Sequence, residues 1–600
     1  MVTLKIDGQE VAVPDGTTVL RAAQSVGVDI PTLCDHKELA PYGGCRMCLV
    51  EVEGARTLQP SCTLPASNNM VVLTNTPKVR EARKFVLTLI FSERNHFCMY
   101  CPVSGGDCEL QNSAYGEGMT HWPLQPNWQP FPMDASHEDF VLDNNRCILC
   151  RRCIRACGEL VGNFTLGVEE RGASTLVIAD LGAPLGESTC ISCGTCVQVC
   201  PTGALIDRAG VFQGREKDVA HVKTTCPGCS VGCGVEMIVR DNRLVRIEGD
   251  WDAPVNDGLL CQIGRFTPMK ETRERLLTPL VRKDGALKAA TWDEALGAIA
   301  DKLKPLAGQN GAGIAAVTSP RLTAEALHDF EQLFGAKLGS PMVTSLEPQA
   351  ATPFTPGMLD ALKTADCVLV AGADLITQHQ VAGFFIKRNL PKGAKLIVID
   401  SADAGSGMTD IADKALIAPK GAEAQTLAGI VTDPAIAKLI AGATKPVIVV
   451  GKSVYWDAAV KLATALNATL ISVQGAANSM AAAMYKLDKP FEPKGRQAVY
   501  VALGDAQITP ALAQQIEGAP FVAVQASYVS QVTAMADVVL PVEMWTEQEG
   551  HYLNLEGRWQ EAHRGINAPV NVWSNEKVFE ALAERVGATL DGNWNPKEGA

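Results

Sequence analysis

Several features are missing from this sequence of 600 residues, and each absence excludes a class of protein. No run of eighteen apolar residues occurs, so we expect no direct membrane span. Lys and Arg total 53 against 66 Asp and Glu, and the net charge of −13 argues against a nucleic-acid-binding surface. The first residues carry no basic or apolar stretch, so we expect no secretory signal. Neither G-x-G-x-x-G nor G-x-x-x-x-G-K-[ST] occurs, so a nucleotide-binding fingerprint is absent.

Cysteine is nearly absent from one half of the chain and concentrated in the other. Nineteen of the twenty cysteines lie within the first 261 residues, and Cys367 alone lies beyond them. A disulfide scaffold spreads its cysteines through a small, loop-rich chain, whereas here they form tight C-x2-C groups in a large one. The pattern indicates metal binding in a reducing compartment, and we expect a cytoplasmic protein. Cys367 has no partner in the sequence and is predicted to be a buried core residue.

The first 78 residues have the pattern of a small β-grasp ferredoxin. Val2, Leu4 and Ile6 alternate with polar residues, and the Asp7-Gly8 pair that follows predicts a hairpin with the next apolar run. A helical pattern comes next, with Gly27 as its C-terminal cap. The first cysteines lie in the loop that follows.

The second half of the chain has the pattern of an α/β region. Short apolar runs alternate with helical patterns such as DEALGAIADKL and AAVKLATAL, which predicts parallel sheet with crossover helices. The runs are residues 367–371, 396–400, 447–451, 499–504 and 521–525. Several runs end in Gly or Asp, which we interpret first as tight turns and alternatively as the edge of a ligand crevice. These residues are Gly372, Asp374, Asp400, Gly451, Gly504 and Asp505.

The first cysteine group is spaced C-x10-C-x2-C-x13-C. It consists of Cys34, Cys45, Cys48 and Cys62. Gly43 and Gly44 precede the central pair and permit a tight wrap of the chain. Four thiolates in a β-grasp context suit a [2Fe–2S] centre. Structural zinc and free thiols are the alternatives, since zinc sites also use C-x2-C pairs.

The second group has three cysteines, and a histidine is the nearest candidate for the fourth ligand. The group is His96, Cys98, Cys101 and Cys108. An imidazole in place of a thiolate makes a cluster less anionic and shifts its reduction potential. The alternative is a surface histidine beside a cluster that some other group completes.

The third and fourth groups repeat one spacing, C-x2-C-x2-C-x3-C, and Pro201 follows the second copy. The copies are Cys147, Cys150, Cys153 and Cys157, then Cys190, Cys193, Cys196 and Cys200. In such repeats the fourth cysteine of each run binds the other cluster. One [4Fe–4S] cluster is therefore predicted on the first three cysteines and Cys200, and the other on Cys157 and the next three. Coincidence or zinc could account for one run but hardly for two.

The fifth group is spaced C-x2-C-x3-C-x27-C and again suits a [4Fe–4S] cluster. It consists of Cys226, Cys229, Cys233 and Cys261. The inventory is then nineteen cysteines and His96 for one [2Fe–2S] and four [4Fe–4S] clusters, about 18 iron ions in all. A row of one-electron sites is predicted to conduct electrons. We find no general acid–base or nucleophilic constellation in the sequence.

Together these residues resemble the large iron–sulfur subunit (the G subunit) of NADH:quinone oxidoreductase, complex I, and its soluble relatives. The first four groups are also similar to the small diaphorase subunit of NAD-reducing [NiFe] hydrogenases and to the N-terminal region of [FeFe] hydrogenases. The fifth group and all that follows are similar to the molybdopterin oxidoreductase family, as in the catalytic subunit of NAD-dependent formate dehydrogenase. Residues 537–560, DVVLPVEMWTEQEGHYLNLEGRWQ, resemble that family's acidic-Gly-Asn-Glu-Gly-Arg stretch.

The sequence also departs from these relatives. The respiratory G subunit usually keeps one of the two ferredoxin-type clusters, whereas both ligand sets are complete here, which favours the soluble relatives. The histidine motif is H-x-C-x2-C-x6-C instead of H-x3-C-x2-C-x5-C. Cys261 is followed by Gln262-Ile263-Gly264 instead of x-K-G. Residues 342–354 hold no metal-binding cysteine, and Ser345 is their only serine. The chain stops soon after the 537–560 stretch. We therefore expect a truncated region without molybdopterin that serves structure and docking.

These expectations define a multidomain protein of the α+β and α/β classes. The predicted domains are a [2Fe–2S] ferredoxin-like β-grasp at 1–78, a [4Fe–4S] module with one histidine and three cysteine ligands at 79–138, a two-[4Fe–4S] ferredoxin at 139–218, a [4Fe–4S] molybdopterin-oxidoreductase-type domain at 219–275, and a truncated molybdopterin oxidoreductase-like α/β domain at 276–600.

The resemblance implies an electron-transfer subunit of an NAD(P)H-linked oxidoreductase complex. The partners it implies are a flavin/NAD(P)-binding subunit, a small [2Fe–2S] subunit, and a hydrogenase or formate dehydrogenase-type catalytic subunit or ferredoxin. Three alternatives stay open: the G subunit of a membrane-bound complex I, an active molybdenum or tungsten enzyme such as formate dehydrogenase, and a zinc-rich scaffold without redox function.

Overall fold

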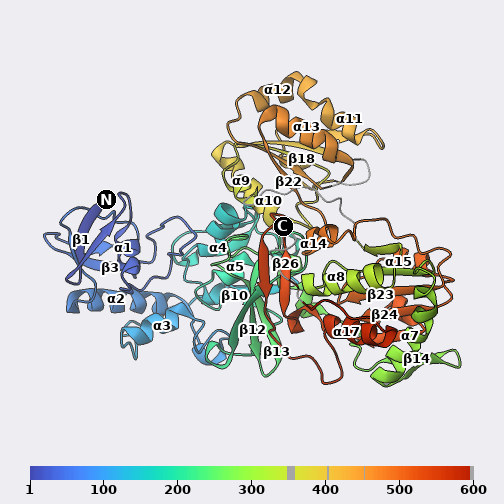
Figure 1. The fold of residues 1–600 in the computed structure, drawn as a ribbon. Helices are drawn as coiled ribbons and strands as arrows, with labels where there is room; N and C mark the ends of the chain where they lie inside the picture. The colour runs from blue at the N-terminus through green and yellow to red at the C-terminus, as the bar shows by residue number, and fades with distance from the viewer. Residues whose placement is uncertain (127, 347–357, 402–404, 452, 593, 595–600) are drawn as a thin grey trace. The chain divides into compact units, whose positions relative to one another are not determined.

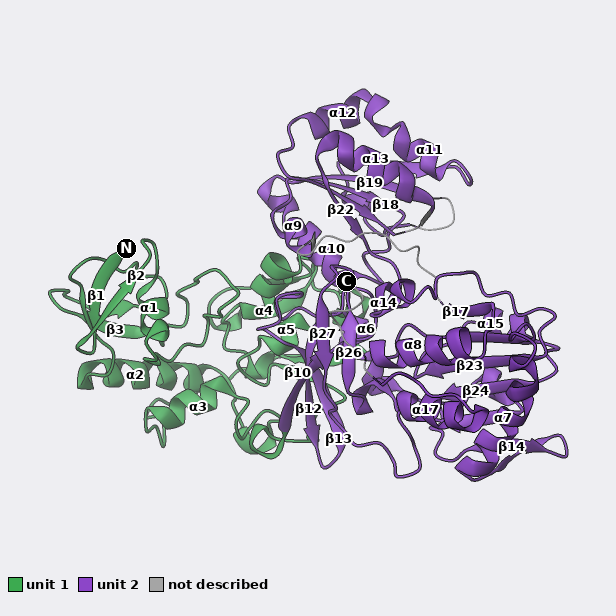
Figure 2. Ribbon diagram, viewed as in Figure 1, with its two compact units in different colours: residues 1–219 green, residues 220–600 purple. Residues whose placement is uncertain are grey.

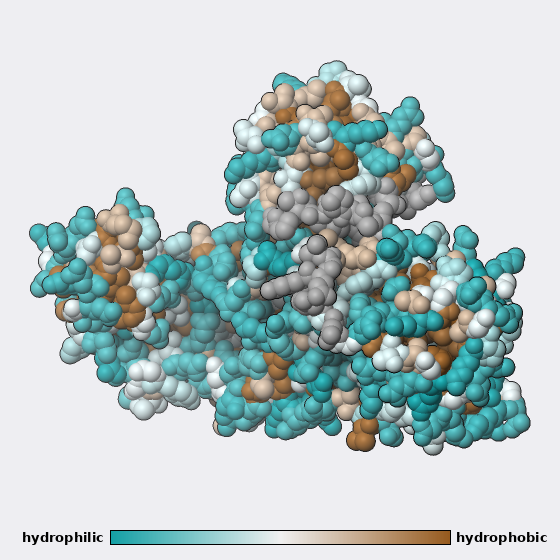
Figure 3. Space-filling model, in the orientation of Figure 1, coloured by the Kyte–Doolittle hydropathy of each residue, from teal (hydrophilic) through white to brown (hydrophobic). Residues whose placement is uncertain are grey.

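The structure, a computed structural model, describes residues 1–126, 128–346, 358–401, 405–451, 453–592 and 594. The chain divides into two compact units, residues 1–219 and 220–600 (Figure 2). This division falls one residue from the boundary predicted between 218 and 219, while the finer domain boundaries stay predictions. Within the described residues, no helix combines the length and apolar character that crossing a bilayer requires. Hydrophilic residues cover most of the face drawn in Figure 3, in line with the net charge of −13.

The N-terminal hairpin is confirmed, and it opens a five-stranded sheet of order β2-β1-β5-β3-β4 (Figure 1). The strands are β1 (Val2–Ile6), β2 (Gln9–Val13), β3 (Leu49–Val52), β4 (Gln59–Pro60) and β5 (Val71–Leu73). Asp7 and Gly8 both adopt positive φ, 47° and 86°, as the tight turn between β1 and β2 requires. Helix α1 (Val19–Ser25) begins at Thr18, whose hydroxyl accepts the Arg21 N–H. Gly27, with φ 76°, lies one residue beyond the cap at Val26, so it ends the helix as predicted.

The rest of the first unit holds short elements between cysteine loops. Its main helices are α2 (Pro77–Glu93), α3 (Glu109–Gly116), α4 (Arg152–Arg155) and α5 (Thr195–Gln198). Its strands are β6 (Met133–Asp134), β7 (Phe140–Asp143), β8 (Leu166–Glu169), β9 (Leu176–Ala179) and β10 (Leu205–Asp207). One apolar core joins the β-grasp loop to α2 and α3, through Leu33, Met47, Leu87, Phe91 and Leu110. The short elements therefore depend on this core and on the cysteine loops for their positions.

The second unit begins with an antiparallel sheet that carries the fifth cysteine group. Its strands are β11 (Ala220–Thr225), β12 (Gly234–Arg240) and β13 (Arg243–Gly249), in that order. Three of the cysteines lie in the loop between β11 and β12, and Cys261 caps α6 (Gln262–Arg265). The hairpin of β26 (Gly550–Leu553) and β27 (Trp559–Ala562) comes from the far end of the chain.

The α/β region contains two sheets, a division that the local sequence pattern does not predict. The larger has seven strands: β15 (Ala286–Ala289), β14 (Leu280–Lys283), β25 (Val538–Pro541), β24 (Val522–Ala526), β23 (Ala498–Gly504), β16 (Ile314–Thr318) and β17 (Met342–Ser345). Helices α7 (Trp292–Ala307), α8 (Ala324–Glu331) and α17 (Asn575–Val586) share one apolar core with this sheet. Helices α15 (Pro510–Ile516) and α16 (Gln531–Met535) share a second core with it. Alternate residues of the central strands belong to the two cores, so both faces of the sheet are covered.

The smaller sheet is formed by the chain between β17 and β23. Its five parallel strands are β20 (Lys414–Ala418), β19 (Lys395–Ser401), β18 (Cys367–Ala371), β21 (Pro446–Val450) and β22 (Thr469–Ser472). Helices α11 (Glu423–Ala428) and α13 (Trp456–Leu466) cover one face, and α9 (Met358–Thr364) and α10 (Gln380–Lys387) lie on the other side (Figure 1). The predicted parallel strands are therefore confirmed. Cys367 is 3% exposed within this core, as predicted.

Removing a core side chain from α7 should destabilise the second unit. Leu296 is fully buried against the seven-stranded sheet, so Leu296→Ala should lower the free energy of unfolding by about 2–5 kcal/mol. Scanning calorimetry of the full chain, with the transition of residues 220–600 followed separately, measures this change. Lys302→Ala on the exposed side of the same helix is the control and should change it by less than about 0.5 kcal/mol. Equal effects of the two substitutions would contradict the assigned core.

Candidate metal centres

The first cysteine group comes from two segments, the loop after α1, which holds Cys34, Cys45 and Cys48, and the segment after β4, which holds Cys62. Contacts between thiols link Cys34 to Cys45 and Cys62, and Cys62 to Cys48. The Cys45 N–H donates to Sγ of Cys34 at 3.4 Å. The glycines act as predicted: Gly43 has φ 70°, and a Cβ at Gly44 would lie 2.4 Å from the Tyr42 ring. The loop after α1 can therefore bend closely around the sulfur atoms of this group.

The three cysteines of the second group and the histidine assigned to them surround a single cavity. His96, Cys98, Cys101 and Cys108 all line this cavity. The Nε2 atom of His96 is buried and has no hydrogen-bond partner, which is the state of a nitrogen available to a metal. Burial lowers the pKa of His96 to about 4, so the ring is neutral at pH 7, the form that binds metal ions. A Cβ at Gly203 would lie 2.6 Å from Sγ of Cys101, so this glycine leaves room for the group, a role that the sequence did not reveal.

The two ferredoxin-type runs exchange their fourth cysteines. One cavity is lined by Cys147, Cys150, Cys153 and Cys200. Another is lined by Cys157, Cys190, Cys193 and Cys196. These are the two crossed sets that the repeated spacing predicts.

The two runs share their backbone conformation around the first cysteine as well as their cysteine spacing. The N–H groups of Leu149 and Ser192 donate to Sγ of Cys147 and Cys190, at 3.3 and 3.4 Å. Both donors have positive φ, 53° and 55°. A non-glycine residue pays about 1–2 kcal/mol for this conformation, so its presence in both copies indicates that the N–H must face the sulfur. Helices α4 and α5 begin three residues after these donors.

The fifth group is held by segments that are far apart in the sequence. The thiol of Cys233 interacts with those of Cys229, Cys226 and Cys261. Gly228 and Gly264 donate N–H bonds to Sγ of Cys226 and Cys261, at 3.4 and 3.3 Å. Three of these cysteines are buried and Cys229 is partly buried, and this burial raises the pKa values of all four thiols.

The stretch of residues 537–560 supplies part of the wall around this group. The Leu555 N–H donates to the carbonyl of Ser230 at 2.8 Å, and the Asn554 amide donates to Val231 at 3.2 Å. The Gln560 amide donates to the carbonyl of Gly232 at 2.7 Å. These bonds fix the loop that carries Cys229 and Cys233, which gives the family-like Asn-Leu-Glu-Gly segment a structural role.

The donor sets fit iron–sulfur clusters. Burial raises the pKa of Cys147 to about 11 and those of Cys108, Cys190 and Cys261 to about 12. Several thiolates kept out of water repel one another, so they need a nearby positive charge, which iron supplies. Within the described part of the chain, no group of three or more His, Cys, Asp or Glu side chains is arranged to hold a single metal ion. The thiols surround spaces that suit clusters of several ions.

Two arginines that the sequence did not single out connect the ligand loops of the first unit. Arg152, 3% exposed and lying between Cys150 and Cys153, binds the Glu109 carboxylate through both Nη atoms at 2.5 and 2.7 Å. Glu109 follows Cys108 of the second group. Arg155 donates to the carbonyls of Cys34 and Ala40. The basic run CILCRRCIRAC carries this information in the sequence, but the partners cannot be identified there.

A cavity of about 1100 Å³ lies in the second unit beside the fifth group. Cys226, Gly228 and Ile263 line it on the side of the group. At the end of β23, Gly504 has φ 56°, and the next residue, Asp505, lines the cavity. At the ends of β18 and β19, by contrast, Asp374 and Asp400 accept hydrogen bonds from their own loops, as tight turns do. The alternative interpretation, in which a strand ends at the edge of a ligand crevice, therefore holds for β23.

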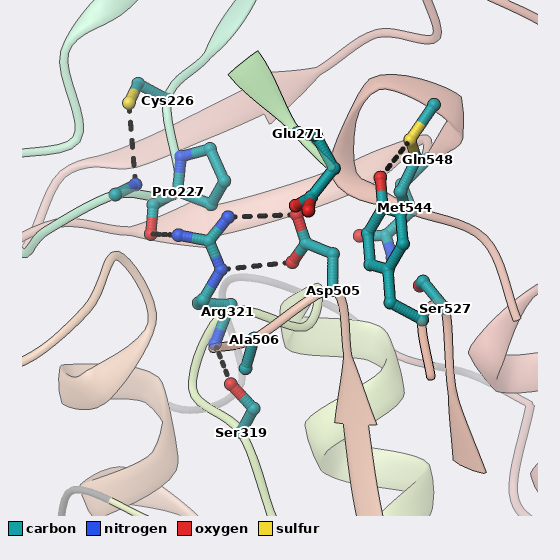
Figure 4. A network of polar contacts seen from close by, with 12 residues as sticks. Cys226, Pro227, Glu271, Ser319, Arg321, Asp505, Ala506, Ser527, Met544 and Gln548 are labelled. Carbon is teal, nitrogen blue, oxygen red and sulfur yellow. Dashed lines mark hydrogen bonds and ion pairs between the residues drawn. The ribbon is translucent and has the colours of Figure 1, made fainter. Parts of the chain in front are cut away.

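Three of the four arginines that line this cavity are already paired with carboxylates. Arg321 binds Asp505 at 2.9 and 3.0 Å (Figure 4). Arg273 binds Glu271 at 2.7 Å, and Arg275 binds Glu547 at 2.6 Å. The phosphate of a molybdopterin binds to cations. These three arginines already have carboxylate partners, whereas Arg243, which also lines the cavity, is exposed. Of residues 342–354, where a metal-binding cysteine is expected in the family, residues 347–354 lie outside the described part of the chain. Leu346 lines the cavity, and Ser345 does not.

Comparison with family models gives the domain order that the sequence predicts. The matches are a 2Fe-2S iron-sulfur cluster binding domain at 1–77, the NADH-ubiquinone oxidoreductase-G iron-sulfur binding region at 83–122, a 4Fe-4S dicluster domain at 146–204, the molybdopterin oxidoreductase Fe4S4 domain at 219–270 and molybdopterin oxidoreductase at 275–585. The chain therefore contains 2Fe-2S and 4Fe-4S binding domains, and the predicted fold class is confirmed.

Curated relatives are subunits of NADH- and NADPH-linked oxidoreductases. The chain is 35% identical to a G-type subunit of NADH-quinone oxidoreductase from Rhizobium meliloti, over 72% of this chain and 51% of that protein. It is 32% identical to NADPH-Fe(3+) oxidoreductase subunit alpha of Geobacter sulfurreducens, over 67% and 48%. Identity to NADH-quinone oxidoreductase subunit 3 of Thermus thermophilus is 29%, over 93% and 79%. A solved chain of an NAD+-reducing [NiFe]-hydrogenase is 37% identical over 36% of this chain and 90% of that chain, with a TM-score of 0.34.

The chain spans about half the length of the first two of these relatives. The resemblance to the large iron–sulfur subunit of complex I is confirmed by these identities and by the match at 83–122. The match at 275–585 covers more than half of the chain, and with the adjoining Fe4S4 domain it shows that the protein belongs to the molybdopterin oxidoreductase family.

Proposed function

We propose that this chain is the iron–sulfur electron-transfer subunit of a multi-subunit NAD(P)H-linked oxidoreductase in the cytoplasm. One observation carries the proposal: twenty predicted donors, nineteen thiols and one orphaned imidazole nitrogen, are gathered into five buried groups. All twenty cysteines are free, which suits a reducing compartment. The names of the relatives support the link to NADH and NADPH.

The ligand assignment that we propose follows the five groups. One [2Fe–2S] cluster takes Cys34, Cys45, Cys48 and Cys62, and the four other groups each take a [4Fe–4S] cluster. These clusters supply one-electron transfer, while the protein supplies burial, N–H bonds to sulfur and spacing. In the first unit a single apolar core contains Cys45 and Cys108 and also Ile148, the neighbour of Cys147. That shared core supports direct transfer among the first three groups.

The complex that we propose has a flavin/NAD(P)-binding subunit and a small [2Fe–2S] subunit on its NAD(P)H side. A hydrogenase or formate dehydrogenase-type catalytic subunit, or ferredoxin, exchanges electrons on the other side. The completeness of both ferredoxin-type sets favours this arrangement. Membership of a respiratory NADH:quinone oxidoreductase, as its G subunit, is the second candidate, favoured by the names of several relatives.

The α/β region of residues 276–600 is proposed to carry no molybdopterin. Three of the four arginines that line its cavity are neutralised by Asp505, Glu271 and Glu547, and Ile263 stands at the lysine position of the x-K-G pattern. Its role in this proposal is to support the fifth group and to dock partner subunits.

Reduction of the native complex tests the function. Purified without oxygen, the complex should be bleached in the visible by NADH or NADPH. The chain alone should contain about 18 iron ions and should be bleached by dithionite but not by NADH, because it has no flavin site of its own in this proposal. Molybdenum and tungsten should be far below one per chain in the chain purified alone. Little iron, or no bleaching by dithionite, would contradict the proposal, and stoichiometric molybdenum or tungsten would favour a catalytic enzyme.

Cysteine substitutions in pairs test the crossed ligation. Cys147→Ala and Cys200→Ala should remove the same cluster, and Cys157→Ala and Cys190→Ala the other one, each with a loss of about four iron ions. Iron analysis and electron paramagnetic resonance of the reduced full chain identify which cluster is lost. The control is Cys367→Ala, which should leave the iron content unchanged. If Cys200→Ala instead matched Cys190→Ala, each run would hold its own cluster and the crossing would be wrong.

Substitutions of His96 test the mixed ligand set. His96→Ala should destabilise the second cluster, whereas His96→Cys should retain it at a lower reduction potential, because a thiolate makes the cluster more anionic. A potentiometric titration followed by electron paramagnetic resonance measures this shift. His121→Ala, at an exposed histidine of the same module, is the matched control. An unchanged cluster in His96→Ala would show that another group supplies the fourth ligand.

A further inference from the structure

The residues directly beside the ligands of the fifth group are uncharged. Gln262, Ile263 and Gly264 follow Cys261, and the loop from Cys226 to Cys233 contains no charged residue. The first cation after Cys261, Arg265, donates to the carbonyl of Ile247 at 3.2 Å. A reduced cluster carries one more negative charge than an oxidised one, so its stability depends on nearby positive charge. The structure places one arginine against this loop.

Arg321 lies between β16 and α8 and reaches the loop of the fifth group. Its Nη1 donates to the carbonyl of Pro227 at 3.4 Å, directly after Cys226 (Figure 4). The next residue, Gly228, donates its N–H to Sγ of Cys226. The Arg321 backbone is fixed as well: its N–H donates to the Ser319 hydroxyl, and its carbonyl accepts the Tyr552 hydroxyl at 3.0 Å.

Asp505 holds the guanidinium in this orientation. Nε and Nη2 of Arg321 donate to the two carboxylate oxygens at 3.0 and 2.9 Å, leaving Nη1 directed at Pro227. The positive end of the ion pair therefore faces the cysteine loop, and the negative end faces away from it. Burial raises the pKa of the Cys226 thiol overall, while Arg321 acts to lower that pKa and the more weakly acting Asp505 acts to raise it.

The charge of Arg321 is permanent. Burial alone would lower the pKa of its guanidinium, but Asp505 raises that pKa above its ordinary value. Burial also disfavours the charge of Asp505, yet Arg321 holds the carboxyl pKa below its ordinary value. Both partners are ionised at neutral pH, so the field on the loop does not depend on protonation there.

We propose that Arg321 is the positioning residue that raises the reduction potential of the cluster on Cys226, Cys229, Cys233 and Cys261. The inference rests on the proposed function, because it requires that cluster. Two other arginines on the cavity wall, Arg273 and Arg275, are paired in the same manner, but they donate to Glu271, Glu547 and backbone carbonyls outside the cysteine loop. The distinguishing feature of Arg321 is thus its contact with the ligand loop.

Charge substitutions in the full chain test this role. In a potentiometric titration without oxygen, Arg321→Gln should lower the midpoint potential of the fifth cluster by at least about 59 mV, a tenfold change in its electron affinity. Arg321→Lys should stay close to the wild-type value, because it keeps the charge. Asp505→Asn should raise the potential, because it leaves the cation uncompensated. The signal is assigned as the one lost in Cys261→Ala.

The control is Arg243→Gln, which removes an equal charge from an exposed residue that lines the same cavity. A shift in Arg321→Gln no larger than in this control, with the cluster retained, would overturn the role of Arg321 and leave the proposed function intact. Shifts of the same sign in Arg321→Gln and Asp505→Asn would overturn it too. If Arg321→Gln loses its cluster, Arg321→Lys and Asp505→Asn decide the question. A wild-type chain with the same iron content and spectra as Cys261→Ala would overturn the fifth cluster itself.

Discussion

The structure depends on one electrostatic problem, which is how to keep groups of sulfur donors together in a low-dielectric interior. Burial raises the pKa of most of these thiols, and a thiolate placed beside others is costly without a compensating positive charge. Iron supplies that charge, and backbone N–H groups supply the remaining stabilisation. N–H bonds to sulfur recur in all five groups, on Cys34, Cys108, Cys147, Cys190, Cys226 and Cys261. The loops are therefore shaped by their sulfurs, and the short elements of the first unit take their positions from those loops.

The features predicted correctly from the sequence are those whose cause is local or repeated. Asp7-Gly8 specifies its hairpin because both residues tolerate positive φ. The crossed gathering of Cys200 and Cys157 follows from two identical spacings, and the structure gathers the thiols in that way. The parallel strands of the second half are recognisable because strands buried on both faces read as continuous apolar runs. In each case a short segment carries enough information to determine the outcome.

What could not be predicted depends on residues far apart in the chain. Arg321 and Asp505 are separated by 184 positions, and Arg152 and Glu109 by 43. A single arginine or carboxylate has no periodic pattern, so the sequence names neither partner. The division of residues 276–600 into two sheets was missed for a related reason. The strand and helix patterns of both sheets are alike. Strand β16 pairs with β17 and also with β23, although the five strands of the smaller sheet lie between β17 and β23 in the sequence.

The pairing of arginines with carboxylates also bears on the electron-transfer role that we propose for this member of the molybdopterin oxidoreductase family. A cavity that binds an anionic cofactor must keep unpaired cations, and unpaired cations are costly when they are partly buried. Here Asp505, Glu271 and Glu547 neutralise three of the four arginines of the lining, so these three need no anionic ligand to balance their charge. The ion pair at Arg321 is asymmetric with respect to the cysteine loop, with its guanidinium toward Pro227. In the proposed role, the positive end of this ion pair therefore faces the ligand loop of the fifth group.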